Sequence, residues 1–378
     1  MTGKKVLIIG AEFNNQGAYL MLRAVAQGIR QHLDGTPVLE HTVGNKRQKR
    51  AVGALGLAPY KLTSRITNRW IQQAACNIAG VLSVHDIDVV LDASGFRYGD
   101  QWRSLDLALT AERLEMFSKL GVPVYMLPQA FGPFDETRDI SGRLLESSRL
   151  VFARDPQSAQ YLTDSVREKY LKERIRTSPD FTGPLKGSFP SGYSHLSGAV
   201  PIIPNWNIVE RATSPEQVRN YKLALAGIAD AIRDTGARAY GLSHEGPRDS
   251  ALLAEIAQLT RAPFEVVNGL DGLSSKGLIG SAPLVISGRY HAISSALSQG
   301  IPVVAHGWSH KYRWLLDDYR VEELLVDPYA PPTDQIARAV NLLSDRRMRE
   351  RIAVAGEQVA LDVDAMWGSI REELEEQP

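Results

Sequence analysis

The chain has 378 residues, a length that predicts about two domains, and its 44% hydrophobic and 23% charged residues are typical of a soluble globular enzyme. Basic and acidic residues balance at 43 each, which argues against a nucleic-acid partner. A balanced net charge is still compatible with a local anion-binding site, which needs only a few cations. Cys76 is the single cysteine, so an intramolecular disulfide framework and a cysteine-rich metal site are excluded. We interpret Cys76 as a buried thiol on a helix around residues 70–79.

The N-terminal region contains only a short apolar run, residues 6–9, which is too short for a signal peptide. No stretch approaches the ~18 apolar residues that a membrane span needs. We therefore predict a cytoplasmic protein without a transmembrane segment. Basic residues gather within residues 43–70, including Lys61 and Arg65. We interpret them as a solvated helical face, with peripheral contact to a membrane or to an anionic lipid-linked saccharide as the minor alternative.

Short aliphatic runs alternate with longer helical segments, a pattern that predicts parallel α/β architecture. In the first half, the predicted strands are residues 6–9, 88–92, 122–127 and 150–153, and the first of them leads to a helix at 18–31. In the second half, the predicted strands are 200–203, 237–242, 284–286 and 301–305, and the helices are 215–234, 250–260 and 333–375.

The Gly-, Ser- and Pro-rich residues 186–198 predict a linker. This predicts an N-terminal Rossmann-like domain over 1–185 and a C-terminal one over 199–378, with the last helix packing back on the first domain. The predicted fold class is α/β, with two Rossmann-like domains facing a central cleft, where small molecules usually bind.

In open parallel sheets, ligands bind outside the carboxyl ends of the strands. In the first half, the loop Asn15-Gln16-Gly17 can aim backbone N–H groups at an anion, although it lacks both the dinucleotide fingerprint and a P-loop lysine. Asp92 ends its strand, where it can accept from a sugar hydroxyl or cap a turn, and Gln129 opens a Gly/Pro turn. We interpret these five residues as ligand contacts on the side of the cleft formed by the first domain.

After strand 150–153, Arg154 is left at the strand tip as a candidate anion ligand. Asp155 is suited to be a helix N-cap with Pro156 at the first helical position, so we predict a structural role for it.

The strongest candidate is Ser287-Gly288-Arg289-Tyr290-His291, between a strand and a helix. It combines a guanidinium, free backbone donors and a titratable ring, which predicts a site for a phosphate or carboxylate.

Two further strand ends carry polar side chains. Lys311 follows strand 301–305 and brings a cation to the same sheet edge. His244, Glu245 and Asp249 follow strand 237–242, where they could serve the base and ribose of a nucleotide-sugar; Glu245 is also a candidate acceptor contact.

These motifs occur in an order and at spacings that resemble the polysaccharide pyruvyl transferase family over almost the whole length. The residues that carry the resemblance are Asn15 to Gly17, Gln129 to Pro133, Arg154 to Ser158, Pro179-Asp180, Arg289 to His291 and Lys311. Three positions depart from the family pattern: Ala18 replaces the usual Asp, Ala93-Ser94-Gly95 replaces a glycine-rich turn, and Tyr290 replaces a hydrophobic residue.

The resemblance implies a GT-B-like fold, no required metal and no cofactor, with phosphoenolpyruvate as the donor substrate. The acceptor is then a pair of sugar hydroxyls on a saccharide or lipid-linked saccharide, and the products are a pyruvate ketal and phosphate. The resemblance further implies that Arg154 and Arg289 hold the donor, with the rest of the run 287–291 beside it. It implies proton transfer by His291, and charge compensation or proton donation by Lys311.

Two alternatives stay open at this point. The first is a GT-B glycosyltransferase that uses a nucleotide-sugar. The second is a saccharide-binding protein without catalysis. Thermal protection by a nucleoside diphosphate would favour the former, and tight glycan binding without turnover the latter.

Overall fold

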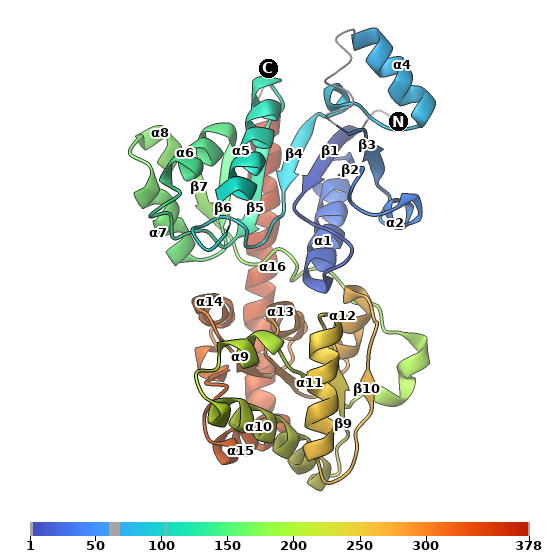
Figure 1. Ribbon diagram of the computed structural model, residues 1–378, viewed down its shortest axis with the longest axis vertical. Helices are drawn as coiled ribbons and strands as arrows, with labels where there is room; N and C mark the ends of the chain where they lie inside the picture. Colours follow the sequence, from blue (N-terminus) through green and yellow to red (C-terminus); the bar gives the residue numbers. More distant parts are fainter. Residues whose placement is uncertain (1–2, 60–68, 103, 377–378) are drawn as a thin grey trace. The chain divides into compact units, whose positions relative to one another are not determined.

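The computed structural model describes residues 3–59, 69–102 and 104–376; the basic residues Lys61 and Arg65 therefore lie outside the described residues. The chain divides into two compact α/β units, whose elements are labelled in Figure 1. The first unit comprises Met1–Asn14, Ala18–Phe181 and Asp362–Pro378, and the second comprises Asn15–Gly17 and Thr182–Leu361.

The first unit contains a parallel sheet in the order β3-β2-β1-β4-β5-β6-β7. Its strands are β1 (Lys4–Ile9), β2 (Gly35–Glu40), β3 (Leu55–Leu57), β4 (Val89–Asp92), β5 (Val124–Gln129), β6 (Leu150–Ala153) and β7 (Ile175–Thr177). The inner strands β4, β5 and β6 are buried along their whole length, as expected of a parallel sheet covered by helices on both faces.

Helices connect these strands and cover the sheet. They are α1 (Gln16–His32), α2 (Lys46–Ala51), α4 (Arg69–Ala79), η1 (Val84–Asp86), α5 (Ser104–Lys119), α6 (Arg138–Ser147), α7 (Pro156–Ser165) and α8 (Lys169–Lys172). The predicted cap of α7 is confirmed: Asp155 accepts a hydrogen bond from Ser158 N at 2.7 Å, and Pro156 is the first helical residue. The helix around Cys76 is also confirmed as α4, and the thiol is buried.

The second unit contains a parallel sheet in the order β10-β9-β8-β11-β12-β13. Its strands are β8 (Val200–Ile203), β9 (Ala239–Leu242), β10 (Val266–Val267), β11 (Val285–Ser287), β12 (Val303–His306) and β13 (Leu325–Val326). Its helices are η2 (Ser191–Leu196), α9 (Trp206–Arg211), α10 (Pro215–Asp234), α11 (Gly246–Leu259), α12 (Gly272–Gly280), α13 (Tyr290–Leu297), α14 (His310–Asp318), η3 (Glu322–Leu324) and α15 (Pro332–Leu343).

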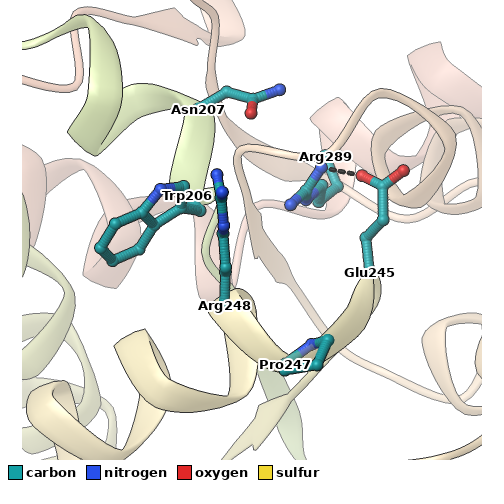
Figure 2. Close-up of a pocket in the computed structure, with 6 residues that line it drawn as sticks. All are labelled: Trp206, Asn207, Glu245, Pro247, Arg248 and Arg289. Carbon is teal, nitrogen blue, oxygen red and sulfur yellow. Dashed lines mark hydrogen bonds and ion pairs between the residues drawn. The ribbon is translucent and has the colours of Figure 1, made fainter.

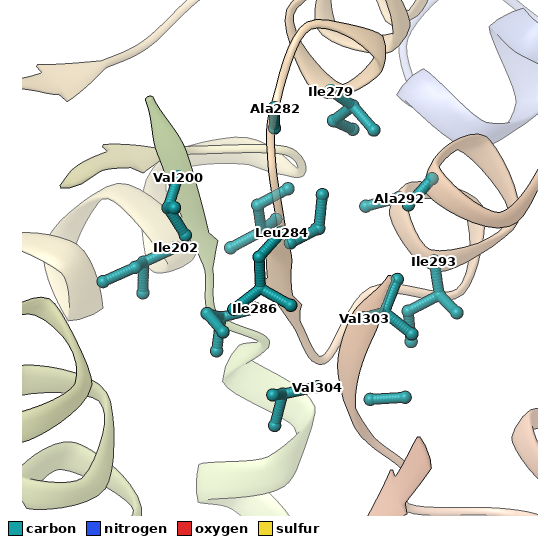
Figure 3. Packing of buried hydrophobic residues seen from close by; sticks show 14 of the residues in the cluster. Val200, Ile202, Ile279, Ala282, Leu284, Ile286, Ala292, Ile293, Val303 and Val304 are labelled. Atoms are coloured by element: carbon teal, nitrogen blue, oxygen red, sulfur yellow. The ribbon is translucent and has the colours of Figure 1, made fainter. Parts of the chain in front are cut away.

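The core of the second unit forms where three central strands meet their covering helices (Figure 3). Ile202, Ile286 and Val304 come from the neighbouring strands β8, β11 and β12, and Ile279 and Ile293 reach this core from α12 and α13. These side chains are fully buried. This packing holds the carboxyl ends of β8, β11 and β12 in fixed positions, which is what a site at that edge requires.

The segment expected to be a linker packs onto the second unit, and the division between the units falls earlier, after Phe181. A Cβ on Gly187 would lie 2.4 Å from Gly277 N, so the two backbones are in close contact. The buried Lys276 ammonium donates to the carbonyls of Thr182 and Gly183 at 2.9 and 3.0 Å. Residues 186–198 are therefore an ordered part of this unit rather than a free connection.

The helix predicted over residues 333–375 is two helices, α15 and α16 (Arg346–Glu375). Ser344 leaves helical geometry, and Asp345 restarts the helix by accepting a hydrogen bond from Met348 N at 2.9 Å. The residues of α16 up to Leu361 belong to the second unit, and those from Asp362 onward belong to the first. Within the described residues, no helix combines the length and the apolar character needed to cross a bilayer.

Candidate functional site

At the carboxyl edge of the first sheet, Asp92 is completely buried at the end of β4. Its carboxylate accepts from Ser94 N at 2.9 Å and from the hydroxyl of the buried Tyr98. Burial raises the pKa of Asp92, and the two hydrogen bonds oppose that shift. Asp92 thus organises the loop that follows its strand; its contact with an acceptor stays a prediction.

Gln129, at the end of β5, and the loop after β6 both lie beside the loop that follows β4. This is because β5 pairs with both β4 and β6. The Gln129 side chain is buried, and neither of its polar atoms has a hydrogen-bond partner within the described residues. Ser158 Oγ, itself donating to Asp155, accepts from Phe131 N at 2.9 Å. This bond joins the turn after Gln129 to the cap of α7. Arg154 is also buried, and its backbone N donates to the Gln129 carbonyl at 2.9 Å.

In the second unit, Arg289 lies at the N-cap position of α13, directly beyond β11. Its guanidinium binds Asp249 of α11 in a bidentate pair, with Nε and Nη2 donating at 2.8 and 2.5 Å. Nη1 donates to Glu245. Asp249 is fully buried, whereas the Glu245 side chain is 35% exposed. Burial lowers the pKa of Arg289 to about 10, so the guanidinium remains charged at neutral pH.

The turn that carries Arg289 is tightly built. Ser287 Oγ accepts from Arg289 N at 2.9 Å, and the Gly288 carbonyl accepts from Asn205 Nδ2 at 2.7 Å and from Tyr312 Oη at 2.9 Å. A Cβ on Gly288 would lie 2.9 Å from Asn205 Cβ and 2.8 Å from Ile208 Cδ1, so a larger residue would displace these neighbours. Arg289 is therefore positioned by its backbone as well as by its carboxylate partners.

Two histidines accompany Arg289. His291, on the first turn of α13, is half-buried with its ring at right angles to that of Tyr290, at a centroid distance of 5.3 Å. His244 follows β9 and is buried, and its Nε2 has no hydrogen-bond partner within the described residues. Burial, with Arg289 and His291 nearby, lowers the pKa of His244 to about 3, which keeps it neutral.

The short segment Asn15–Gly17 groups with this unit and approaches the same residues. Asn15 Nδ2 donates to Glu245, and a Cβ on Gly17 would lie 2.2 Å from His291 Cδ2. Gln16 Oε1 is buried with no hydrogen-bond partner in the described parts of the chain. The structure thus brings Asn15 and Gly17 to Glu245 and His291, contacts that their sequence separation did not predict.

Lys311 lies on the first turn of α14, after β12, among aromatic rings. Its Nζ is 4.9 Å from the centroid of Trp308 and 5.7 Å from those of Tyr290 and Tyr312. Arg211 stacks on Trp308 at 4.3 Å. Aromatic faces attract a cation, so these rings limit the freedom of the Lys311 side chain.

A pocket of about 340 Å³ opens at this edge of the second unit (Figure 2). It is lined by Trp206, Asn207, Glu245, Pro247, Arg248 and Arg289. Figure 2 shows the Arg289–Glu245 pair at one side of the opening, with Trp206 and Arg248 at another. Two guanidinium groups meet at this opening, and each has carboxylate partners: Arg289 pairs with Glu245 and Asp249, and Arg248 pairs with Glu210.

Several residues of this site were not among the predicted donor ligands. Trp206, Asn207 and Arg248 were missed, and Asp249 and His244 were assigned to the nucleotide-sugar alternative. The strand-end rule would have found Trp206 and Asn207, which begin α9, with two residues between it and the end of β8. The pairing of Asp249 with Arg289 has no local signal. Within the described residues, no group of three or more His, Cys, Asp or Glu side chains is placed to hold a metal ion.

Comparison with known proteins identifies both a family and a fold. The family model for polysaccharide pyruvyl transferase matches residues 15–310 of this chain. No curated protein matches the sequence significantly.

Solved structures with the same fold include a putative UDP-N-acetylglucosamine 2-epimerase from Listeria monocytogenes, 12% identical, with a TM-score of 0.64 over 100% of this chain and 98% of that one. The UDP-GlcNAc 2-epimerase from Neisseria meningitidis, bound to UDP-GlcNAc, is 11% identical, with a TM-score of 0.60 over 97% and 100%. Anabaena HepE, in complex with UDP and glucose, is 13% identical, with a TM-score of 0.54 over 99% and 99%. At these identities the likeness shows the fold alone, which is α/β and GT-B-like with two Rossmann-like domains, as predicted.

Proposed function

Because this chain belongs to the polysaccharide pyruvyl transferase family, we propose that it transfers the pyruvyl group of phosphoenolpyruvate to two hydroxyls of a sugar. The product is a pyruvate ketal, and phosphate is released. The observation that carries the proposal is Arg289, a buried and charged guanidinium that is held rigidly at a pocket with a second arginine, Arg248.

Donor binding rests on the arrangement of charge around Arg289. Asp249 occupies Nε and one hydrogen of Nη2, which leaves donors on Nη1 and Nη2 facing away from the pair. Glu245 uses one of those donors, and its partly exposed carboxylate can withdraw. We assign the carboxylate or phosphate of phosphoenolpyruvate to the place that Glu245 now occupies, with Arg248 offsetting further negative charge.

The chemistry requires proton transfers and charge compensation. Protonation of the vinyl carbon creates an oxocarbenium-like centre at the carbon that bears the phosphate. One sugar hydroxyl attacks that carbon, the carbon–oxygen bond to phosphate breaks, and the second hydroxyl closes the ring. The two protons lost by the hydroxyls balance the one gained by the new methyl group and the one that leaves with phosphate.

His291 and Lys311 are assigned to these steps. His291 removes the proton of the attacking hydroxyl, and as a general base it contributes roughly 10²–10⁴-fold to the rate. Lys311 offsets the charge of the departing phosphate, and the three rings around it hold its Nζ in place. His244, which is neutral, borders Arg289 and His291 without adding a competing charge.

The first test is calorimetric binding of phosphoenolpyruvate to wild type, Arg289→Ala and Arg289→Lys. We expect Arg289→Ala to weaken binding by about tenfold or more, because charge-assisted hydrogen bonds are lost, and Arg289→Lys to retain part of it. Arg261→Ala, which removes an exposed arginine of the same unit, is the matched control and should bind normally. Circular dichroism checks that each variant is folded.

Transfer itself is tested with phosphoenolpyruvate and a panel of nitrophenyl glycosides. Released phosphate, together with a product heavier by one pyruvate less one water, would support the ketal. Normal binding to Arg289→Ala would refute the assigned donor site.

A nucleotide-sugar glycosyltransferase is the second candidate, because Trp206 gives the pocket an aromatic surface on which a base can stack. Thermal stabilisation by uridine diphosphate, with none by phosphoenolpyruvate, would favour this candidate over pyruvyl transfer.

A further inference from the structure

The helix α4 of the first unit presents apolar side chains to solvent. Trp70 is 87% and Ile78 is 90% exposed, and Ile71, Ala74 and Ala75 are exposed as well. At about 100° per residue these five positions fall within about 140° of the helix circumference. The buried Cys76 lies on the opposite side of the helix. The apolar stripe therefore faces outward, the reverse of an ordinary surface helix.

The sequence around this helix contains basic residues but no acidic ones. Between Glu40 and Asp86 there is no acidic residue, while the basic residues are Lys46, Arg47, Lys49, Arg50, Lys61, Arg65 and Arg69. Among those whose side chains the structure describes, Lys46, Arg47 and Arg50 are exposed on α2. An outward apolar stripe with basic residues nearby and no acidic ones suits an anionic surface that has an apolar interior.

Both helices belong to one edge of the first sheet. The α2 helix packs on β3, the edge strand, and Leu57 of β3 forms a parallel bridge with Leu82, just after α4. Leu82 N also donates to the Gly56 carbonyl at 2.8 Å. Figure 1 shows α4 beyond the end of β3. The apolar stripe and the exposed cations are thus attached to the same strand.

We propose that α4 and the exposed basic residues of α2 dock this protein on an anionic phospholipid surface. Trp70 and Ile78 enter the boundary between headgroups and acyl chains, while the exposed cations of α2 are attracted to the lipid phosphates. Tryptophan suits this boundary because its ring is apolar and its N–H can remain hydrogen-bonded. Docking would bring the enzyme to acceptors that are attached to lipid.

The test is co-sedimentation of the full chain with vesicles. We expect binding to vesicles of phosphatidylglycerol mixed with phosphatidylcholine, and little binding to phosphatidylcholine alone. Added salt should weaken binding because it screens the charges. The double variant Trp70→Gln, Ile78→Gln should bind roughly tenfold less, since two apolar anchors are lost.

The matched control is Leu105→Gln, Leu109→Gln on α5, which removes two other exposed leucines of the same unit. It should bind vesicles like wild type. The proposal is overturned if wild type ignores anionic vesicles, or if both double variants lose binding equally. It is also overturned if light scattering shows a dimer that only the α4 variant dissociates, because a second copy then covers this face. Vesicle binding needs no turnover, so its result is independent of phosphoenolpyruvate binding.

Discussion

Two buried aspartates at the carboxyl edges of the two sheets have different partners. Asp92 in the first unit is held by a backbone N–H and a tyrosine hydroxyl, which are neutral donors. Asp249 in the second unit is held by the guanidinium of Arg289 and by Trp206 N. Neutral partners order a loop, whereas a buried carboxylate paired with arginine keeps a cation in a fixed position. Of the two aspartates, only Asp249 has a guanidinium among these partners, so Arg289 is the cation whose position a buried carboxylate determines.

The largest expected effect in the second unit is a loss of turnover when His291 is replaced. His291→Ala should lower kcat by roughly 10²–10⁴-fold, since it removes the general base, while phosphoenolpyruvate binding changes little. The measurement is phosphate release with a glycoside acceptor, alongside calorimetry. His41→Ala, which removes an exposed histidine of the first unit, serves as control. Near-full turnover of His291→Ala at saturating substrates would contradict the assignment of His291 as the general base.

Replacing each aspartate tests the comparison directly. Asp249→Ala leaves the Arg289 charge buried without its main partner, which we expect to lower the free energy of unfolding by about 3 kcal/mol or more. Asp92→Asn keeps the shape of its side chain, and the loss should be about 1 kcal/mol or less. Thermal and denaturant unfolding measure both. Equal losses would show that the two carboxylates play the same structural part.

Acid should weaken the second unit through its buried histidines. Burial lowers the pKa of His244 to about 3 and that of His306 to about 4, while the unfolded chain protonates both near pH ~6.5. Below that pH the unfolded state binds more protons, so stability is present above about 6.5 and is lost on acidification.

The expected slope is about 1.4 kcal/mol per pH unit for each histidine between about pH 6 and 4. Melting curves across this range measure it. His306→Asn should reduce the slope, and an unchanged slope would contradict the assignment.

The smallest expected effect concerns the exposed partner of Arg289. Glu245→Gln should tighten phosphoenolpyruvate binding a few-fold, because the variant removes a carboxylate that competes for the guanidinium. Calorimetry measures the change, with Glu216→Gln on α10 as the control. Weaker binding would mean that Glu245 orients Arg289 instead of competing with the donor.

The local sequence pattern was sufficient to predict the central strands and the cap of α7. Residues 6–9 and 200–203 are continuous apolar runs because strands buried on both faces have no solvent side. Edge strands such as β3 and β7 are three residues long and partly exposed, so their sequences contain no continuous apolar run and were not predicted as strands. The break between α15 and α16 was missed because Ser344 and Asp345 resemble residues of an exposed helix face.

The sequence by itself determined the α/β class, the strand ends at which polar residues gather and the Arg289–His291 turn, because these depend on local periodicity and on the geometry of parallel strands. Only the tertiary structure decided what those residues touch. Asp249 lies 40 positions from Arg289, and Glu245 lies 44. Pairs so distant depend on how α11 and α13 pack on one sheet, and no short-range pattern records that packing.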